Sequence, residues 1–139
     1  MAIDSEKIEK YFKLKLAAEM GPFGLKALVD DKKAQFNLVD VRRPEDYKAG
    51  HIPGAVNIPS AELETKYKTL NKKFRTVVYC YNITCFSAPK AALFLAKKGY
   101  WSTELIGGYE SYKQAGFPVE TKAPKAEKVE APKPELVAA

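Results

Sequence analysis

The stretch TVVYCYNITCFSAPKAALFLAKKG, residues 76–99, decides the fold of this chain. Its first four residues are β-branched or aromatic, and such a run predicts a buried strand. Cys80 follows at the carboxyl end of that strand. After a short loop, Ser87 can cap a helix whose apolar face lies within residues 91–96, and Gly99 ends the helix. The stretch therefore predicts a cysteine between a strand and the N-terminus of a helix.

Cys80 is a candidate nucleophile because of this position. The unpaired N–H groups and the positive dipole end of a helix N-terminus stabilise an anion. A thiol held there should ionise more easily than a free thiol, and the same place should receive an anionic substrate. The alternative is that Cys80 is only a small buried apolar residue, which is the usual role of a free cysteine.

Helix and strand patterns alternate along the rest of the chain. Asp4 or Ser5 can cap a short first helix, and a second helix begins at Pro22. Further strands are expected at 12–16 (exposed or at an edge), 36–41, 55–58 and 103–106, with helical segments at 44–49, 61–70 and 109–115. This order predicts a three-layer α/β domain: a mostly parallel five-stranded sheet with helices on both faces, which binds ligands beyond the carboxyl ends of its strands.

Length and composition limit the classes of function. The 139 residues suffice for one domain with a real core, and 46% of them are hydrophobic. The net charge of +6 is not concentrated in a basic run with interleaved aromatics, so we expect no nucleic-acid partner. The first residues lack the apolar core of a signal peptide, and no apolar run is long enough for a membrane span. Two cysteines form no disulfide framework, so we expect a cytoplasmic protein whose close thiols serve chemistry.

The end of the chain has a different composition. Residues 121–139 contain three prolines, no aromatic residue and alternating charges, so they cannot bury enough apolar surface to order themselves alone. The expected organisation is a helical extension at 1–11, a domain at 12–119 and a flexible tail at 120–139. A small docking motif at Leu136 and Val137 is the alternative for the tail.

Three dispersed pieces of sequence carry a family resemblance. LVDVRRPEDYKAGHIPGAVNIP (38–59), VVYC (77–80) and LIGGYESYKQAGFPV (105–119) together resemble a single-domain rhodanese, of the sulfurtransferase family, from about residue 12 to 119. The resemblance implies the same rhodanese-like α/β fold, with Cys80 as the sulfur carrier. Framework positions of the family then fall on Arg42, Asp46 and the turn at 51–55. The substrate loop falls on Tyr81, Asn82, Ile83, Thr84, Cys85, Phe86 and Ser87.

The reaction that the resemblance implies is a two-step sulfur transfer. The Cys80 thiolate attacks the outer sulfur of a small anionic donor such as thiosulfate and becomes a persulfide, whose charge the backbone N–H groups of the loop hold. Cyanide, a small thiol or a protein cysteine then accepts the sulfur. Neither a metal nor an organic cofactor is needed.

The loop departs from the common pattern of that family. An arginine usually stands five residues after the cysteine, with Ser or Thr next, but this chain has Cys85 and Phe86. A subgroup of the family shares this spacing of two cysteines. Without a fixed cation in the loop, efficient turnover of a dianion is not expected, although Lys90 could substitute in part. The missing arginine also argues against the related phosphatases.

Cys85 has two interpretations that the sequence does not separate. It is either a resolving thiol, which attacks a persulfide or sulfenic acid on Cys80, or a residue that fills space under the loop. The pair also allows a second function: a noncatalytic sulfur relay or redox-sensing regulatory module that uses Cys80 and Cys85.

The other polar candidates have structural explanations. His51 could act as a general base, but in a Pro and Gly turn we expect it to bond the backbone. Together with the two cysteines it offers only three zinc ligands at no recognised spacing. Arg42 is expected to form an ion pair that braces a strand end. Tyr109 and Tyr112 either border the pocket or pack in the core.

Overall fold

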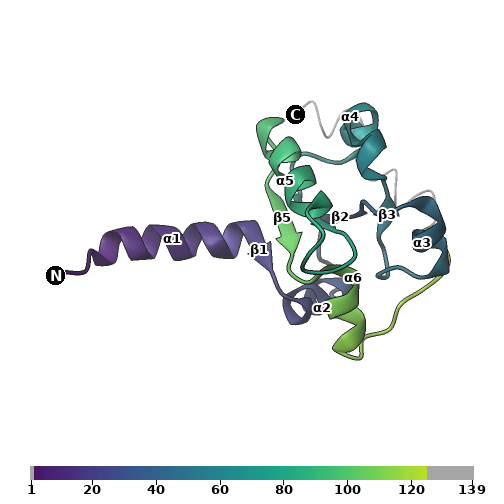
Figure 1. Ribbon diagram of the computed structural model, residues 1–139, viewed down its shortest axis with the longest axis horizontal. Helices are drawn as coiled ribbons and strands as arrows, with labels where there is room; N and C mark the ends of the chain where they lie inside the picture. The colour runs from purple at the N-terminus through teal and green to yellow at the C-terminus, as the bar shows by residue number, and fades with distance from the viewer. Residues whose placement is uncertain (1, 125–139) are drawn as a thin grey trace.

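An all-parallel five-stranded sheet forms the centre of the structure, a computed structural model that describes residues 2–124 (Figure 1). Its strand order is β1-β5-β4-β2-β3. The strands are β1 (Glu19–Met20), β2 (Phe36–Asp40), β3 (Val56–Asn57), β4 (Arg75–Tyr79) and β5 (Ser102–Leu105). The predicted α/β fold is confirmed, and the sheet is wholly rather than mostly parallel.

Helices cover both faces of the sheet, and several of them begin where the sequence supplies a start signal. They are α1 (Ser5–Ala18), α2 (Pro22–Asp30), α3 (Pro44–Ala49), α4 (Leu63–Lys66), α5 (Ser87–Lys97) and α6 (Gly108–Gln114). Proline occupies the first turn of α2 and of α3, where its missing N–H costs little. Gly50 ends α3, and Gly99 follows α5 at a φ of 88°, a conformation that favours glycine.

Alternation along the strands produces two separate cores, one on each face of the sheet. Val39 and Val78 lie in the core under α4 and α5. Leu38, Val77 and Tyr79 lie in the other, with residues of α2, α3 and α6. Because neighbouring strand residues point to opposite faces, continuous apolar runs are what a sheet covered on both sides requires.

Three local expectations are wrong. Residues 12–16 do not form a strand but continue α1, because Phe12 and Leu16 are spaced as well for one face of a helix as for alternation. The helix expected at 61–70 is broken into α4 and two 3₁₀ turns, Ser60–Glu62 and Tyr67–Thr69. Ser87 does not cap α5: Phe86 is its N-cap, and no side chain caps the helix.

The chain beyond α6 returns to the turn that follows α3. Glu120 forms an antiparallel bridge with His51, with N···O distances of 2.8 and 2.9 Å. Contacts with the domain therefore continue past residue 119, where the sequence suggested a boundary. Residues 125–139, including the docking motif considered at Leu136 and Val137, lie outside the described residues. Within residues 2–124, no helix combines the length and apolar character needed to cross a membrane.

Candidate active site

Cys80 stands directly after β4, which lies between β2 and β5 in the sheet. The thiol side chain packs in the core under α5, and only 2% of the residue is exposed. Its location between a central parallel strand and the start of a helix is the one that the sequence predicted. Such edges of parallel sheets are where α/β proteins bind ligands.

Two glycines bring α6 against the backbone of Cys80. Gly107 and Gly108 have φ values of 80° and 60°. A Cβ atom on Gly108 would lie 2.6 Å from the carbonyl oxygen of Cys80 and 2.9 Å from the carbonyl carbon of Tyr81. The next two N–H groups, of Tyr109 and Glu110, donate to the carbonyls of Cys80 and Tyr81, each at 2.9 Å. The start of α6 thus holds the start of the loop in place.

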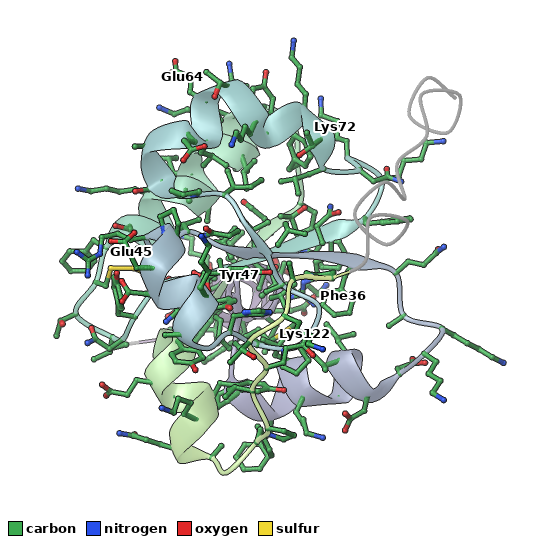
Figure 2. The ribbon with its side chains drawn as sticks, turned by 90° about the vertical axis from the view of Figure 1, so that its right-hand side faces the viewer. Phe36, Glu45, Tyr47, Glu64, Lys72 and Lys122 are labelled. Carbon is green, nitrogen blue, oxygen red and sulfur yellow. A yellow bond between two sulfur atoms is a disulfide. The ribbon has the colours of Figure 1, made fainter. Side chains whose placement is uncertain are left out.

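Cys80 and Cys85 are joined by a disulfide, the yellow bond in Figure 2. Their Cα atoms are 6.4 Å apart. Cys85 is partly exposed, whereas Cys80 lies beneath it. The two thiols that the sequence singled out are therefore within bonding reach of each other, as a resolving pair requires.

The loop between the cysteines is organised by Asn82. Its side-chain oxygen accepts hydrogen bonds from the N–H and the hydroxyl of Thr84, and its carbonyl accepts one from the N–H of Cys85. Two of the N–H groups expected to hold a persulfide are therefore used inside the loop. Ile83 and Phe86 project from it, 64% and 67% exposed, so the rim of the site is apolar.

A buried ion pair braces the strand end beside the loop. The Arg42 guanidinium contacts both carboxylate oxygens of Asp40 and donates to the carbonyl of Gly50. It also lies 4.0 Å from the ring centre of Tyr109. Burial alone would lower the pKa of Arg42, but the hydrogen bonds and charge of Asp40 raise it overall. Arg42 thus has the bracing role that the sequence suggested, with Asp40 as its partner.

Tyr81 connects the loop to α3. Its hydroxyl donates to the carboxylate of Asp46, which also accepts from Arg43. The Tyr81 hydrogen bond, and then Arg43, lower the pKa of Asp46. The resemblance placed Asp46 on a family motif, but the sequence did not indicate this partner. A tyrosine directly after the candidate nucleophile was the available signal.

Two surface depressions flank the loop, and each contains both signs of charge. One, of about 460 Å³, is lined by Ser87 together with Lys90 and Glu64. The other, of about 390 Å³, is lined by Tyr81 and Asn82 together with Lys113 and Glu110. Because a carboxylate accompanies each lysine, neither depression favours a small dianion strongly.

His51 is fully buried, and its ring nitrogens lie close to backbone carbonyl groups. Its ring stacks on Tyr47 with the ring centres 3.8 Å apart, and its two nitrogens lie 2.9 Å from the carbonyl oxygens of Tyr47 and Lys122. One ring nitrogen thus faces α3 and the other faces the segment at Lys122, so the ring contacts the backbone, as the structural interpretation of this residue proposed. Between residues 2 and 124, no group of three or more His, Cys, Asp or Glu residues could hold a metal ion.

Comparison with known families identifies the domain. The family model described as "Rhodanese-like domain" matches residues 24–115. This chain belongs to the rhodanese-like family. The rhodanese-like domain has the fold that the resemblance implied, and the loop after β4 is its candidate active-site loop.

Similarity to solved structures agrees with this assignment. The BH2092 protein of Bacillus halodurans is 32% identical, with a TM-score of 0.79, and the match covers 84% of this chain and 86% of that one. A rhodanese-related protein of Thermoplasma volcanium is 26% identical, with a TM-score of 0.67, covering 76% and 99%.

Among curated proteins, the HTH-type transcriptional regulator Rv0324 of Mycobacterium tuberculosis is 41% identical over 90 residues, which is 65% of this chain and 40% of the regulator. The chain spans less than half the length of the curated relatives it matches.

Proposed function

We propose that this rhodanese-like domain is a sulfurtransferase that carries sulfane sulfur on Cys80, with Cys85 as its resolving thiol. The observation that carries the proposal is the disulfide between a cysteine at the end of the central strand and a second cysteine on the loop that leads into α5. A lone structural cysteine at Cys80 would need no such partner. The lack of a side-chain cap on α5 leaves its first N–H groups for a thiolate or persulfide.

The first step loads the sulfur. The Cys80 thiolate attacks the outer sulfur of the donor, a new S–S bond forms, and the donor leaves with the electron pair of its broken bond; thiosulfate would leave as sulfite. The mixed charges around the loop favour a donor with less charge than thiosulfate, such as a persulfide of a small thiol or of a protein.

The second step has two outcomes. An acceptor thiolate attacks the outer sulfur and leaves Cys80 as a thiolate. Alternatively, the Cys85 thiolate attacks the inner sulfur, the Cys80–Cys85 disulfide forms, and hydrosulfide leaves. A reducing thiol would then attack the partly exposed Cys85 sulfur and release the buried Cys80 as the thiolate. The exposed Ile83 and Phe86 at the rim favour a protein as the acceptor.

The same disulfide supports a second candidate function, a redox-sensing or sulfur-relay module without turnover of small acceptors. In that case an oxidant closes the pair and a thiol opens it. One relative is named as a transcriptional regulator, which agrees with such a role, although the match covers only 40% of that regulator.

Intact mass and cyanide treatment separate the two functions. Reduced parent, Cys80→Ser and Cys85→Ser proteins are incubated with thiosulfate or with glutathione persulfide, and sulfur released by cyanide is measured as thiocyanate. We expect no labile sulfur on Cys80→Ser, stable labile sulfur on Cys85→Ser, and conversion of the parent to the disulfide with release of sulfide. If neither donor loads the parent or Cys85→Ser while mild oxidant still closes the disulfide, the redox module replaces the sulfurtransferase.

A further inference from the structure

The depression between α6 and the loop after Cys80 has the position and the size of a site for a small ligand. It is lined by two loop residues and four residues of α6: Tyr81, Asn82, Tyr109, Glu110, Lys113 and Gln114. Its volume of about 390 Å³ is within the range of small-molecule sites. The hydrogen bonds from the N–H groups of Tyr109 and Glu110 to the carbonyls of Cys80 and Tyr81 hold its two sides together. We call this depression the α6 pocket.

Two tyrosine rings in the lining of the α6 pocket are held in place from behind. The buried Arg42 guanidinium lies 4.0 Å from the ring centre of Tyr109 and 5.7 Å from that of Tyr81. The Tyr109 hydroxyl occupies the space that a side chain at Gly50 would need, and the Tyr81 hydroxyl donates to Asp46. Because both rings are fixed before a ligand arrives, packing against them costs little conformational entropy.

Glu110 and Lys113 bring opposite charges to the pocket. They stand three residues apart on α6, a spacing at which helix side chains are neighbours. Neither of them forms an ion pair with any residue between 2 and 124. Lys113 Nζ instead lies over the ring of Tyr109, 5.5 Å from its centre. Within the described part of the chain, the pocket therefore has a carboxylate and an ammonium group that do not neutralise each other.

This pair of charges is complementary to the amino-acid end of a small peptide. The ammonium group of such a ligand fits Glu110, and its carboxylate fits Lys113. The side-chain amides of Asn82 and Gln114 can form hydrogen bonds with peptide groups. A dianion such as thiosulfate has no ammonium group, and Glu110 would repel it.

The length of α6 limits where the sulfur of the ligand can be. Gly108 packs against the carbonyl of Cys80, and Lys113 lies about 7.5 Å further along the helix at 1.5 Å per residue. Free cysteine is too short for this distance, because its amino-acid group adjoins the carbon that carries the thiol. A γ-glutamyl group on the nitrogen of cysteine places an amino-acid end one extended side chain and one peptide bond away from that residue.

We propose that the α6 pocket binds the γ-glutamyl end of a small peptide thiol of the glutathione type and brings its sulfur to the Cys80–Cys85 disulfide. The thiolate attacks the partly exposed Cys85 sulfur, the bond between the two cysteines breaks, and Cys80 leaves with the electron pair as a thiolate. A second peptide thiolate attacks the ligand sulfur of the mixed disulfide, forms the oxidised peptide disulfide and releases Cys85 as a thiolate.

This proposal rests on the disulfide of the proposed function and not on sulfur transfer itself. The persulfide of the same peptide is then the small donor that the pocket favours for loading Cys80. A test that follows only the opening of the disulfide can therefore succeed or fail independently of the sulfurtransferase.

The test is the rate at which small thiols open the disulfide of the full chain, measured by alkylation and intact mass and expressed per thiolate. Glutathione and γ-glutamylcysteine have the γ-glutamyl end, cysteinylglycine lacks it, and dithiothreitol is an uncharged reference. Two exposed ion pairs of about two- to fivefold each predict that the two γ-glutamyl thiols react about tenfold faster than cysteinylglycine. Glutathione and γ-glutamylcysteine should react alike, because the glycine end lies outside the pocket.

Charge-neutralising variants test the two contacts separately. Glu110→Gln and Lys113→Gln should each lower the ratio of the glutathione rate to the dithiothreitol rate by about two- to fivefold. General attraction of an anionic thiol would instead change this ratio in opposite directions in the two variants, because one variant removes a negative charge and the other a positive charge. The matched controls are Glu6→Gln and Lys10→Gln on α1, which extends away from the loop (Figure 1) and should leave the ratio unchanged. Circular dichroism checks that each variant is folded.

Three results would overturn the proposal: equal rates for glutathione and cysteinylglycine, opposite changes in the two α6 variants, or equal changes in the α1 controls. A parent that prefers γ-glutamyl thiols but never carries cyanide-labile sulfur would support the pocket and reject the sulfurtransferase. Labile sulfur on a parent without this preference would do the reverse.

Discussion

Gly108 is the position at which a single methyl group should damage the site most specifically. In Gly108→Ala, the new Cβ atom would lie 2.6 Å from the carbonyl oxygen of Cys80 and 3.0 Å from the amide nitrogen of Asn82. Both are backbone atoms, which cannot rotate away as a flexible side chain could. Either α6 or the loop must therefore move.

Two contributions set the size of the effect. An L-residue in the left-handed conformation, at a φ of 60°, costs about 1–2 kcal/mol. Separation of α6 from the loop also breaks the hydrogen bonds from Tyr109 and Glu110 to the carbonyls of Cys80 and Tyr81, each worth about 0.5–1.5 kcal/mol. We expect Gly108→Ala to lower the free energy of unfolding by about 2–5 kcal/mol.

Gly116 is a matched control at the other end of α6. Its φ is 87°, but a Cβ atom there would have nothing within 4 Å. Gly116→Ala should therefore cost only the conformational part, about 1–2 kcal/mol. Urea unfolding of both variants in the presence of a reductant measures the difference, and the yield of cyanide-labile sulfur shows whether the loop has moved. Gly108→Ala should lose sulfur loading, and Gly116→Ala should retain it.

The reasoning would be refuted if the two alanine variants had the same stability within about 0.5 kcal/mol, the usual scatter of such differences. Equal sulfur loading would refute the second part, namely that α6 positions the Cys80 loop.

Three further predictions concern the surroundings of the loop. His51→Ala should lower stability by about 2–4 kcal/mol in urea unfolding but leave the rate of sulfur loading unchanged; a large loss of rate in the folded variant would restore His51 as a general base. The folded-state pKa of Asp46 lies below its unfolded value of 3.8, so its contribution to stability is complete above that pH and is lost as the pH falls through the lower folded value. Urea midpoints measured against pH should fall less steeply below 3.8 in Tyr81→Phe than in the parent, and equal slopes would contradict the Tyr81 effect. Arg42→Met should cost about 3–5 kcal/mol because Asp40 is left charged and buried, and adding Asp40→Asn should recover part of that loss; a double variant no more stable than Arg42→Met would count against the ion pair.

The sheet and the place of Cys80 were predictable because local patterns determine them. The apolar run of a strand, such as Thr76–Tyr79, and the proline that starts a helix, such as Pro22 or Pro44, are signals that lie within a few residues. These elements appear where they were expected. Residues 12–16 were not predictable in the same way. Their alternating pattern suits an edge strand as well as a helix face, and only the path of the chain into β1 decides between them.

Contacts between segments that are distant in the chain could not be predicted from the sequence. The hydrogen bond of Tyr81 with Asp46 joins residues 35 positions apart, and the one between His51 and Lys122 joins residues 71 positions apart. The local sequence can single out one residue of such a pair, as it does for the tyrosine after Cys80, but it does not identify the partner. The same holds for α1, because the exposure of its apolar residues could not be predicted from the sequence.

The sequence by itself determined the fold class, the position of a cysteine at the end of the central strand, and the presence of a second thiol five residues later, because propensity, turn chemistry and spacing are local properties. Tertiary structure alone decided that Cys85 reaches Cys80, that Gly108 must be a glycine, and that the apolar residues of α1 are exposed. Each of these depends on the distance between atoms that folding brings together, a quantity that no local pattern of residues contains.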